Sequence, residues 1–335
     1  MVQRRLRVIC VFFGICLTVF FICHYYHQIL IFGTIFYWKL NLRELKQTAS
    51  YLHCSTINKT RVDELRNELN RFTQHHEPVL VQDNIHVDYK YYGNYFKESF
   101  TIDKSKRELL AKTFPPNKTM FSKCSIVGNG GILKNSSCGA DIDSSDFVLR
   151  MNVPQIQGFV KDAGRKTNFT SVACSSASLT EDGVPCGAFH AAKFIKGLKS
   201  FNGYIMWVPS SWTHAPSMKS AFIFAEILRK NSNLQLVLSN AIYSQKFSEY
   251  WHINGKILSS GMTMVSIAIS FCEEIHLYGF WPFPFSASGN SLPMHYSEDL
   301  PWTSYRQTHD YPAEFDLLTK LHRQGVLKLH VENCH

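Results

Sequence analysis

The stretch Lys123-Cys-Ser-Ile-Val-Gly-Asn-Gly-Gly131 decides the fold class of this chain. Residues 123–127 are short and mostly apolar, which is typical of a buried strand. The four residues that follow, 128–131, are rich in glycine, so the backbone could approach a ligand closely and direct its N–H groups at a phosphate. The spacing is not that of a complete G-x-G-x-x-G motif. The stretch therefore fits a nucleotide site and an ordinary tight turn equally well.

Strand-like and helix-like segments alternate after this stretch. The predicted strands cover residues 123–127, 147–151, 204–208, 234–238, 275–278 and 326–330. The predicted helices cover residues 218–229, 241–251, 262–273 and 312–324. Strands that alternate with helices of this length imply a mostly parallel sheet with helices on both faces. The predicted fold class is therefore α/β.

The N-terminus resembles an uncleaved signal-anchor. Arg4, Arg5 and Arg7 precede an apolar run over residues 8–23, and apolar residues resume over 29–38 after a His/Tyr break. Together the runs reach the ~20 residues that a bilayer core requires, and the arginines before them place the N-terminus in the cytosol. A cleaved signal peptide is the alternative, but no clear cleavage site of small residues follows.

Four parts of the chain follow from this topology. Residues 39–115 are polar and charged, with a helical pattern only over 61–72, and Pro115-Pro116 marks a break. We predict a cytosolic tail (1–7), a transmembrane anchor (8–38), a stem (39–115) and a lumenal catalytic domain (116–335).

The residues after the anchor suit an oxidising and glycosylating compartment. Asn-x-Ser/Thr sequons occur at Asn58, Asn117, Asn135 and Asn168. Seven cysteines follow the anchor, namely Cys54, Cys124, Cys138, Cys174, Cys186, Cys272 and Cys334. Because seven is odd, at least one is unpaired or intermolecular. Cys54 is the candidate for a stem-linked homodimer.

The formal charge of +9 is distributed along the chain rather than concentrated in runs. This distribution argues against a nucleic-acid partner, and it suits an enzyme with anionic substrates.

Three segments besides the glycine stretch could carry chemistry. Ser259-Ser260-Gly261 opens a predicted helix, where hydroxyls and free N–H groups could bind an anion or simply cap the helix. Residues 279–283, Gly-Phe-Trp-Pro-Phe, follow a predicted strand and could flank a base or a sugar, or pack in the core. His295 and His309 lie in loops, where an imidazole could accept a proton or steady a phosphate.

Asp141-Ile-Asp143 is a fourth candidate because Asp-x-Asp binds the divalent cation in many nucleotide-sugar transferases. The pattern lies in a polar loop before a strand, which favours solvated turn chemistry instead. We therefore predict no metal.

The motifs together resemble one known family. Residues 124–139 read Cys-Ser-Ile-Val-Gly-Asn-Gly-Gly-Ile-Leu-Lys-Asn-Ser-Ser-Cys-Gly, and Arg150-Met151-Asn152 follows. Residues 258–262 read Leu-Ser-Ser-Gly-Met, and residues 271–283 read Phe-Cys-Glu-Glu-Ile-His-Leu-Tyr-Gly-Phe-Trp-Pro-Phe. His295-Tyr296 and His309-x4-Glu314 come next. These segments resemble the large, small, third and very small motifs of the animal sialyltransferases, closest to their α2,8-linking branch.

The resemblance implies a Rossmann-like fold and transfer of sialic acid from CMP-sialic acid with inversion, without a cofactor or metal. On that pattern His309 would be the general base, and Glu314 would orient rather than react. The residues that would bind the donor are Asn129, Gly130, Asn152, Ser259, Ser260, Gly261, Trp281 and His295. The resemblance also implies disulfides Cys124–Cys272 and Cys138–Cys334.

The implied acceptor is a terminal sialic acid on a glycolipid, such as a ganglioside, or on a glycoprotein, and the implied location is the Golgi membrane with the catalytic domain in the lumen. This chain has Met151 where the branch usually has Cys, and Cys174-Ser-Ser176 where it usually has Asn-Pro-Ser. The missing asparagine motivates one alternative, a weak or inactive glycan-binding protein with the same fold. A polysialic-acid-extending enzyme is the other.

Overall fold

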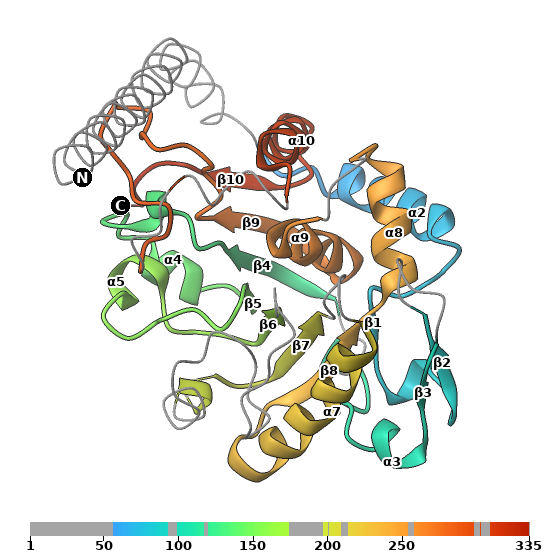
Figure 1. The fold of residues 1–335 in the computed structure, drawn as a ribbon. Coiled ribbons are helices and arrows are strands. Elements are labelled where there is room, and N and C mark those ends of the chain that lie inside the picture. The colour runs from blue at the N-terminus through green and yellow to red at the C-terminus, as the bar shows by residue number, and fades with distance from the viewer. Residues whose placement is uncertain are drawn as a thin grey trace, which may run out of the picture. The chain divides into compact units, whose positions relative to one another are not determined.

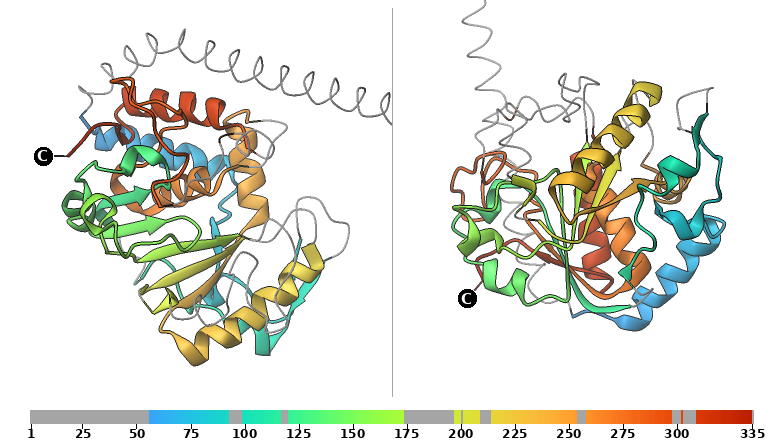
Figure 2. Two further views of the ribbon diagram at one scale, coloured as in Figure 1. Left: turned by 60° about the vertical axis from the view of Figure 1, so that its left-hand side comes forward. Right: turned by 90° about the horizontal axis from the view of Figure 1, so that it is seen from below.

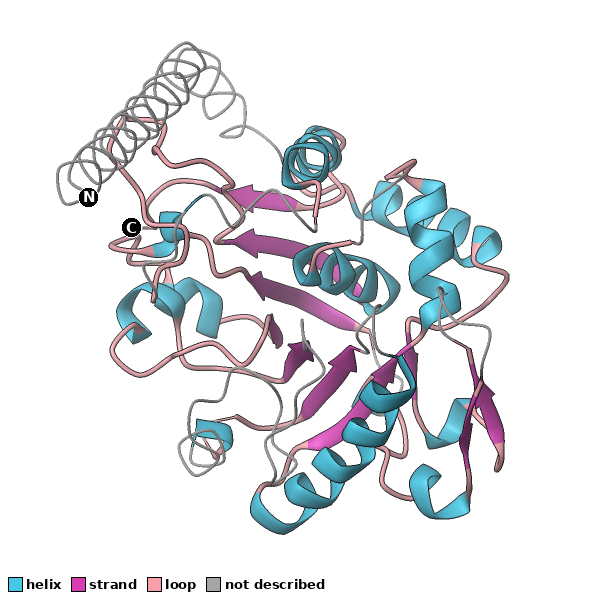
Figure 3. Ribbon diagram, viewed as in Figure 1, coloured by secondary structure: helices cyan, strands magenta, loops and turns pink. Residues whose placement is uncertain are grey.

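An eight-stranded sheet organises the chain in the computed structural model (Figure 1). The strand order is β1-β8-β7-β6-β5-β4-β9-β10. All neighbouring strands are parallel except β1, which runs antiparallel to β8. Figure 3 shows these strands in magenta. The bounds are β1 Val79–Leu80, β4 Phe121–Val127, β5 Phe147–Arg150, β6 Phe169–Ala173, β7 Tyr204–Val208, β8 Gln235–Ser239, β9 Cys272–Tyr278 and β10 Lys328–His330.

The structure describes residues 56–92, 99–116, 120–173, 197–199, 201–208, 214–253, 258–297, 302 and 309–334. Residues 52–284 and 291–335 belong to one unit, which carries every feature discussed below. Residues 285–290 lie outside this unit. They form a turn in which Ser286 N donates to Asn290 O at 2.8 Å.

Helices cover both faces of the sheet, as predicted. One face packs against α4 (Gly139–Asp143), α5 (Val160–Ala163) and α7 (His214–Asn231). The other packs against α9 (Ser260–Phe271), and the right-hand view of Figure 2 separates α9 from α4 and α5. The mostly parallel α/β fold is therefore confirmed.

Two further helices extend the layer formed by α9. Tyr243 of α8 (Ala241–Tyr250) donates its hydroxyl to Ser266 O at 3.2 Å. Arg66 of α2 (Lys59–Phe72) donates Nε to Ile269 O at 2.7 Å. Helix α10 (Tyr311–Arg323) packs next to β10, and it carries the C-terminal part of the site described below.

An aromatic cluster fills the space between α9 and the sheet. Phe114 lies at its centre, with ring centroids 5.1 Å from Phe169, 5.0 Å from Tyr204 and 5.3 Å from Phe271. These residues come from segments far apart in the sequence. Each aromatic ring buries a large apolar area, so the cluster contributes strongly to joining the two halves of the sheet.

Residues 59–115 lie within the folded unit, although we interpreted them as stem. They contribute α2, β1, the β2–β3 pair (Tyr89–Tyr91 and Phe100–Ile102) and α3 (Lys104–Arg107). The buried Tyr91 hydroxyl donates to Ser239 O at 2.9 Å, which ties this segment to β8. The segment is polar in composition because its helix contacts the domain through few apolar side chains, mainly Val62, Leu65 and Leu69.

Several predictions fall outside the described residues. These are the tail and anchor (1–38), the first part of the stem, Cys54, Asn117, Cys174 and Cys186. Within the described ranges, no helix combines the length and the apolar character needed to cross a membrane.

Both disulfides implied by the resemblance are present. Cys124 of β4 is bonded to Cys272 at the start of β9, and Cys138 is bonded to Cys334 near the C-terminus. The first joins neighbouring strands that are separated by 148 residues in sequence. In the chain-entropy model a closed loop of this length stabilises the fold by about 5 kcal/mol.

Two neutral histidines lie together where β9 and β10 pair. His276 Nδ1 and His330 Nε2 are 3.0 Å apart, and the His330 ring stacks on Tyr278 with centroids 4.2 Å apart. Burial lowers the pKa of His276 to about 4 and that of His330 to about 3, and the charges of Lys123 and Lys328 act in the same direction.

Acidification from pH 6.5 toward pH 4 should therefore lower the free energy of unfolding. The unfolded chain binds protons at these histidines near pH 6.5, whereas the folded chain does not, so their contribution is complete above pH 6.5 and is lost below it. Each such group changes the free energy by up to about 1.4 kcal/mol per pH unit. Denaturant titrations between pH 7 and pH 5 measure this slope. His330→Phe should flatten it, and replacement of the exposed His75 should not; equal slopes in all three proteins would contradict the prediction.

Candidate active site

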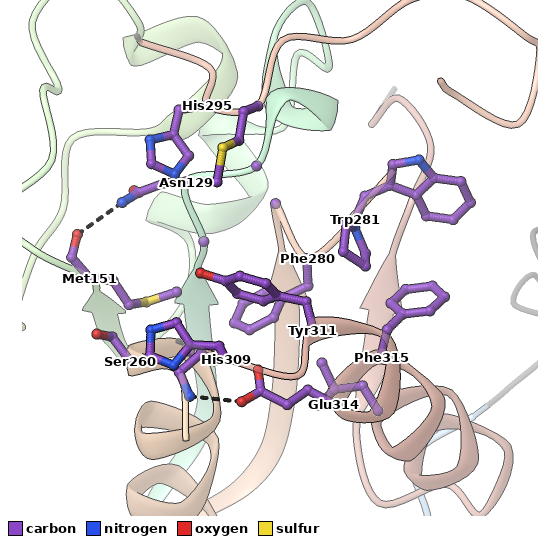
Figure 4. Close-up of a pocket in the computed structure, with 18 of the residues that line it drawn as sticks. Asn129, Met151, Ser260, Phe280, Trp281, His295, His309, Tyr311, Glu314 and Phe315 are labelled. Carbon is purple, nitrogen blue, oxygen red and sulfur yellow. Dashed lines mark hydrogen bonds between the residues drawn. The ribbon is translucent and has the colours of Figure 1, made fainter. Parts of the chain in front are cut away.

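A pocket of about 240 Å³ lies beyond the carboxyl ends of β4, β5 and β9. In an open parallel sheet this is where ligands bind. Every residue that we predicted for catalysis or donor binding lines this pocket, together with others that we did not predict (Figure 4). The lining is Gly128, Asn129, Gly130, Met151, Asn152, Ser259, Ser260, Gly261, Gly279, Phe280, Trp281, Pro282, Met294, His295, Trp302, His309, Tyr311, Glu314, Phe315 and Leu318.

The floor of the pocket is a crossing of two glycine loops. Gly128 N donates to Tyr278 O at 2.7 Å, and Gly130 N donates to Gly279 O at 3.0 Å. A Cβ on Gly128 or on Gly130 would lie 2.5 Å from Gly279 O. Gly279 itself has φ +74, and its Cβ would lie 2.6 Å from Gly128 O. Only glycines allow the loops after β4 and β9 to approach this closely.

Asn129 presents an unpaired oxygen in the pocket wall. Its Nδ2 donates to Met151 O at 3.3 Å, and its backbone oxygen accepts from Tyr296 N at 2.9 Å. Its Oδ1 is buried and has no hydrogen-bond partner among the described residues. A buried amide oxygen without a donor costs free energy, so Asn129 is prepared to accept a hydrogen bond from a ligand.

Strand β6 holds Asn152 in a left-handed backbone conformation, which non-glycine residues rarely adopt. Its φ is +60, its backbone N donates to Ser171 Oγ at 3.1 Å, and Ser171 Oγ donates to its Oδ1 at 3.2 Å. These two contacts with Ser171 fix the orientation of the Asn152 backbone and side chain at the edge of the pocket. Asparagine is one of the few non-glycine residues that adopt this region readily.

Ser259 is the N-cap of α9, the simpler of the two roles that we considered for it. Its Oγ accepts from Met262 N at 3.2 Å. Among the described residues, the first-turn N–H groups of Ser260 and Gly261 have no protein acceptor. These N–H groups and the Ser260 hydroxyl lie at the N-terminal end of a 12-residue helix. The helix dipole makes this end positive, so it favours binding of an anion.

Glu314 connects α10 to the start of α9. It is only 4% exposed, and its Oε1 accepts from Ser259 N at 2.7 Å. Burial raises its pKa to about 7 although the contacts with Ser259 act in the opposite direction, and the charge of Asp310 raises it further. The sequence pattern indicated an orienting role for Glu314, and its contact partner is the start of α9.

The two predicted histidines lie at opposite ends of the pocket (Figure 4). His295 is next to the glycine loop, where its backbone forms a bridge with Gly130. His309 precedes Asp310, which is the N-cap of α10 and accepts from Ala313 N at 3.3 Å. The His309 and Tyr311 rings meet edge to face with centroids 5.4 Å apart. The start of α10 thus presents His309 to the pocket.

Aromatic side chains form the remaining wall. Trp281 is 3% exposed and packs edge to face on Phe283 and Phe315, with centroids 5.0 and 5.6 Å apart. It therefore combines the two roles that we considered, core packing and pocket lining. Burial and the charge of Glu314 raise the pKa of Tyr311 to about 12, so its hydroxyl remains protonated.

Sequence reasoning missed Met151 and Met294 as pocket residues, and it gave no role to Tyr311 or Phe315. Phe280 belonged to the candidate segment 279–283 but was not singled out. The only signals were aromatic residues next to Trp281 and next to the His309–Glu314 pair. Aromatic residues at such positions are as common in a core as in a site.

Asp143 has a structural role. Its Oδ1 accepts from Arg165 N at 2.9 Å and from Lys166 N at 2.8 Å, and its Oδ2 accepts from Arg165 N at 3.0 Å. It therefore closes the turn after α5. Within the described ranges, no group of three or more His, Cys, Asp or Glu side chains is arranged to hold a metal ion.

Asp143→Ala should destabilise the fold by about 2 kcal/mol, because the N–H groups of Arg165 and Lys166 lose a charged acceptor. Asp141→Ala, at the exposed partner of the Asp-x-Asp pattern, should change stability by less than about 0.5 kcal/mol.

EDTA should leave transfer by the unmodified protein unchanged. Thermal unfolding and an assay with and without EDTA test these expectations; loss of transfer in EDTA would restore the metal interpretation.

The sequons differ in accessibility. Asn58 and Asn135 are exposed. Asn168 is half-buried, and its Oδ1 accepts from Val148 N at 2.9 Å between β5 and β6. Glycosylation of all three stays a prediction.

Residues 61–326 match the family model of glycosyltransferase family 29 (sialyltransferase). An α-N-acetylneuraminide α-2,8-sialyltransferase of Xenopus tropicalis is 33% identical over 247 residues, which cover 72% of this chain and 69% of that protein. Two crystal structures of a mammalian sialyltransferase share the fold, one of them in complex with Gal-β-1-3GalNAc-ortho-nitrophenol. Their TM-scores are 0.54 and 0.52 and their identities 22% and 21%, and each alignment covers 79% of this chain and 93% of the other. The chain therefore belongs to glycosyltransferase family 29 and is a sialyltransferase.

Proposed function

We propose that this sialyltransferase moves sialic acid from CMP-sialic acid, with inversion, onto a terminal sialic acid of a glycolipid or glycoprotein glycan in α2,8 linkage. The observation that carries the proposal is the convergence of His309 and the start of α9 on one pocket. A proton acceptor and an anion site in one pocket are what transfer from a phosphate-activated sugar would require.

The donor would bind along the pocket from the glycine loop to α9. On this proposal the Oδ1 of Asn129 and the side chain of Asn152 would contact the nucleotide. The N–H groups of Ser260 and Gly261 would hold the phosphate or the sialyl carboxylate, and His295 would support the departing phosphate. Trp281 contributes to the apolar wall.

His309 would accept the proton of the attacking hydroxyl at an imidazole nitrogen. The deprotonated oxygen forms a bond to the anomeric carbon of the donor sugar while the bond from that carbon to the phosphate oxygen breaks. CMP leaves with the electron pair, and attack from the opposite face inverts the configuration. Because CMP is already a good leaving group, a base and stabilisation of the phosphate charge suffice.

The α2,8 linkage and the sialylated acceptor rest on similarity to the Xenopus tropicalis enzyme. The Golgi membrane rests on the sequence, through the predicted signal-anchor and the sequons that follow it. Expression of the full chain with a lumenal-glycosylation assay tests the location: endoglycosidase treatment should lower its mass, and an unchanged mass would contradict it.

Transfer is tested by incubating the full chain with CMP-sialic acid and with sialylated or unsialylated oligosaccharide acceptors, followed by linkage analysis of the product. We expect one or a few sialic acids in α2,8 linkage on the sialylated acceptor alone. Long polymers would identify a polysialic-acid-extending enzyme. Acceptor binding without transfer would identify a glycan-binding protein.

A further inference from the structure

Glu314 is a buried carboxyl group next to the proposed phosphate site. It is 4% exposed and lines the same pocket as Ser260 and Gly261. Its Oε1 accepts the N–H of Ser259 at 2.7 Å, immediately before the two N–H groups that have no acceptor among the described residues. The Glu314 carboxylate and a bound phosphate would therefore both lie at the N-terminal end of α9.

Few ionisable groups of the described residues lie near Glu314. From its own segment these are Asp310, whose charge opposes ionisation, His309 and the phenol of Tyr311. From α9 it meets only the hydroxyl and N–H of Ser259. Ser259, its hydrogen-bond partner among the described residues, carries no charge. Burial raises its pKa to about 7, which moves its titration into the neutral range.

We propose that Glu314 is a positioning residue that takes up a proton when the donor phosphate binds at the start of α9. This inference rests on the proposed function, because it requires a nucleotide phosphate in the pocket. A second negative charge close to a buried carboxyl group disfavours its ionised form. The linkage is reciprocal, so protonation of Glu314 must strengthen phosphate binding by the same factor.

A protonated Glu314 can still hold the helix start. Its carbonyl oxygen continues to accept the Ser259 N–H, so α9 stays in place while the repulsion of the phosphate disappears. Because Glu314 lies five residues after His309 on the segment that begins α10, the same contact keeps the proposed base aligned with the phosphate site.

Calorimetry on the full chain tests the proposal with the methyl ester of CMP as the probe. Its phosphodiester carries one fixed charge, as in the donor, whereas the phosphate of CMP itself titrates near pH 6. Titrations at pH 7 in buffers of different ionisation enthalpy give the number of protons bound. His295 and His309 can also bind protons near a phosphate, so the difference between the wild type and Glu314→Gln isolates Glu314.

We expect Glu314→Gln to take up measurably fewer protons than the wild type, by a fraction of one proton per bound probe. Its affinity for the probe should depend correspondingly less on pH between 6 and 8. Asp316→Asn, which removes an exposed carboxylate from the same helix, should behave as the wild type does. Equal proton uptake in the wild type and Glu314→Gln would overturn the inference. Absence of probe binding to the wild type would instead overturn the proposed function.

A second measurement needs no variant. The infrared difference spectrum of wild-type protein with ¹³C-labelled glutamate should gain a protonated-carboxyl band when the probe binds. Its absence, with the probe bound, would overturn the inference even if Glu314→Gln failed to fold.

Discussion

Replacement of His309 by alanine should reduce kcat for sialyl transfer by about 10³-fold, the middle of the range for loss of a general base. His309 lies at the start of α10 and lines the pocket opposite the glycine loop. Without its imidazole, the acceptor hydroxyl must attack while still protonated. Since the donor contacts lie on other elements, the affinity for CMP should change by less than about threefold, a difference of about 0.6 kcal/mol. Steady-state kinetics and CMP titration measure both quantities.

His295→Ala is the matched comparison for the first prediction. His295 lines the same pocket from the loop that pairs with Gly130. Because its proposed role is to support the departing phosphate, its removal should weaken CMP binding as well as transfer. Retention of transfer by His309→Ala within tenfold of the wild type would exclude His309 as the base.

Gly279→Ala should destabilise the folded unit by about 3 kcal/mol or more and lower Tm by roughly 10 °C. The added Cβ would lie 2.6 Å from Gly128 O and 2.7 Å from Leu133 Cδ1, at a residue with φ +74. The Leu133 side chain could shift, but the Gly128 carbonyl belongs to the backbone and cannot move aside without displacing its loop. The two loops must separate, which also displaces Asn129 and weakens nucleotide binding.

Gly158→Ala separates the two causes of that loss. Gly158 has φ +90, but a Cβ there meets nothing within 4 Å. Its replacement should cost only the conformational strain, about 1 kcal/mol. Equal decreases in Tm for Gly158→Ala and Gly279→Ala would contradict this prediction. They would show that the close approach of the two loops is not the reason why residue 279 must be glycine.

Apolar patterning located most of the strands and long helices that the structure contains. The strand predicted over 204–208 has the observed bounds, and the one predicted over 123–127 begins two residues early in the structure, at Phe121. Strand β6 was missed because it reads Phe-Thr-Ser-Val-Ala, and its Thr170 and Ser171 are buried but polar. Their hydroxyls bind the backbone of Val153 and Asn152. The N–H groups of Asn152 and Val153 meet these hydroxyls only when the loop after β5 lies beside β6. The sequence of β6 alone does not show this contact.

The sequence predicted which residues belong to the site, but not how these residues are arranged in space. Local patterns identified the glycine loop, the helix start at Ser259 and the two histidines. The contact between Glu314 and Ser259 joins residues that are 55 positions apart, and no local signal pairs them. The same holds for the crossing of Gly128 and Gly279, which depends on β4 and β9 being neighbours in the sheet.

The antiparallel pairing of β1 with β8 has a consequence for solubility. Val79 and Leu80 pair with Ser239 and Leu238 and so occupy backbone groups that β8 would otherwise present to solvent. An unpaired strand at the border of a sheet is a template for association with other chains. A shortened protein that began at residue 116 would uncover β8 and should self-associate, whereas one that began ahead of α2 would keep this border closed.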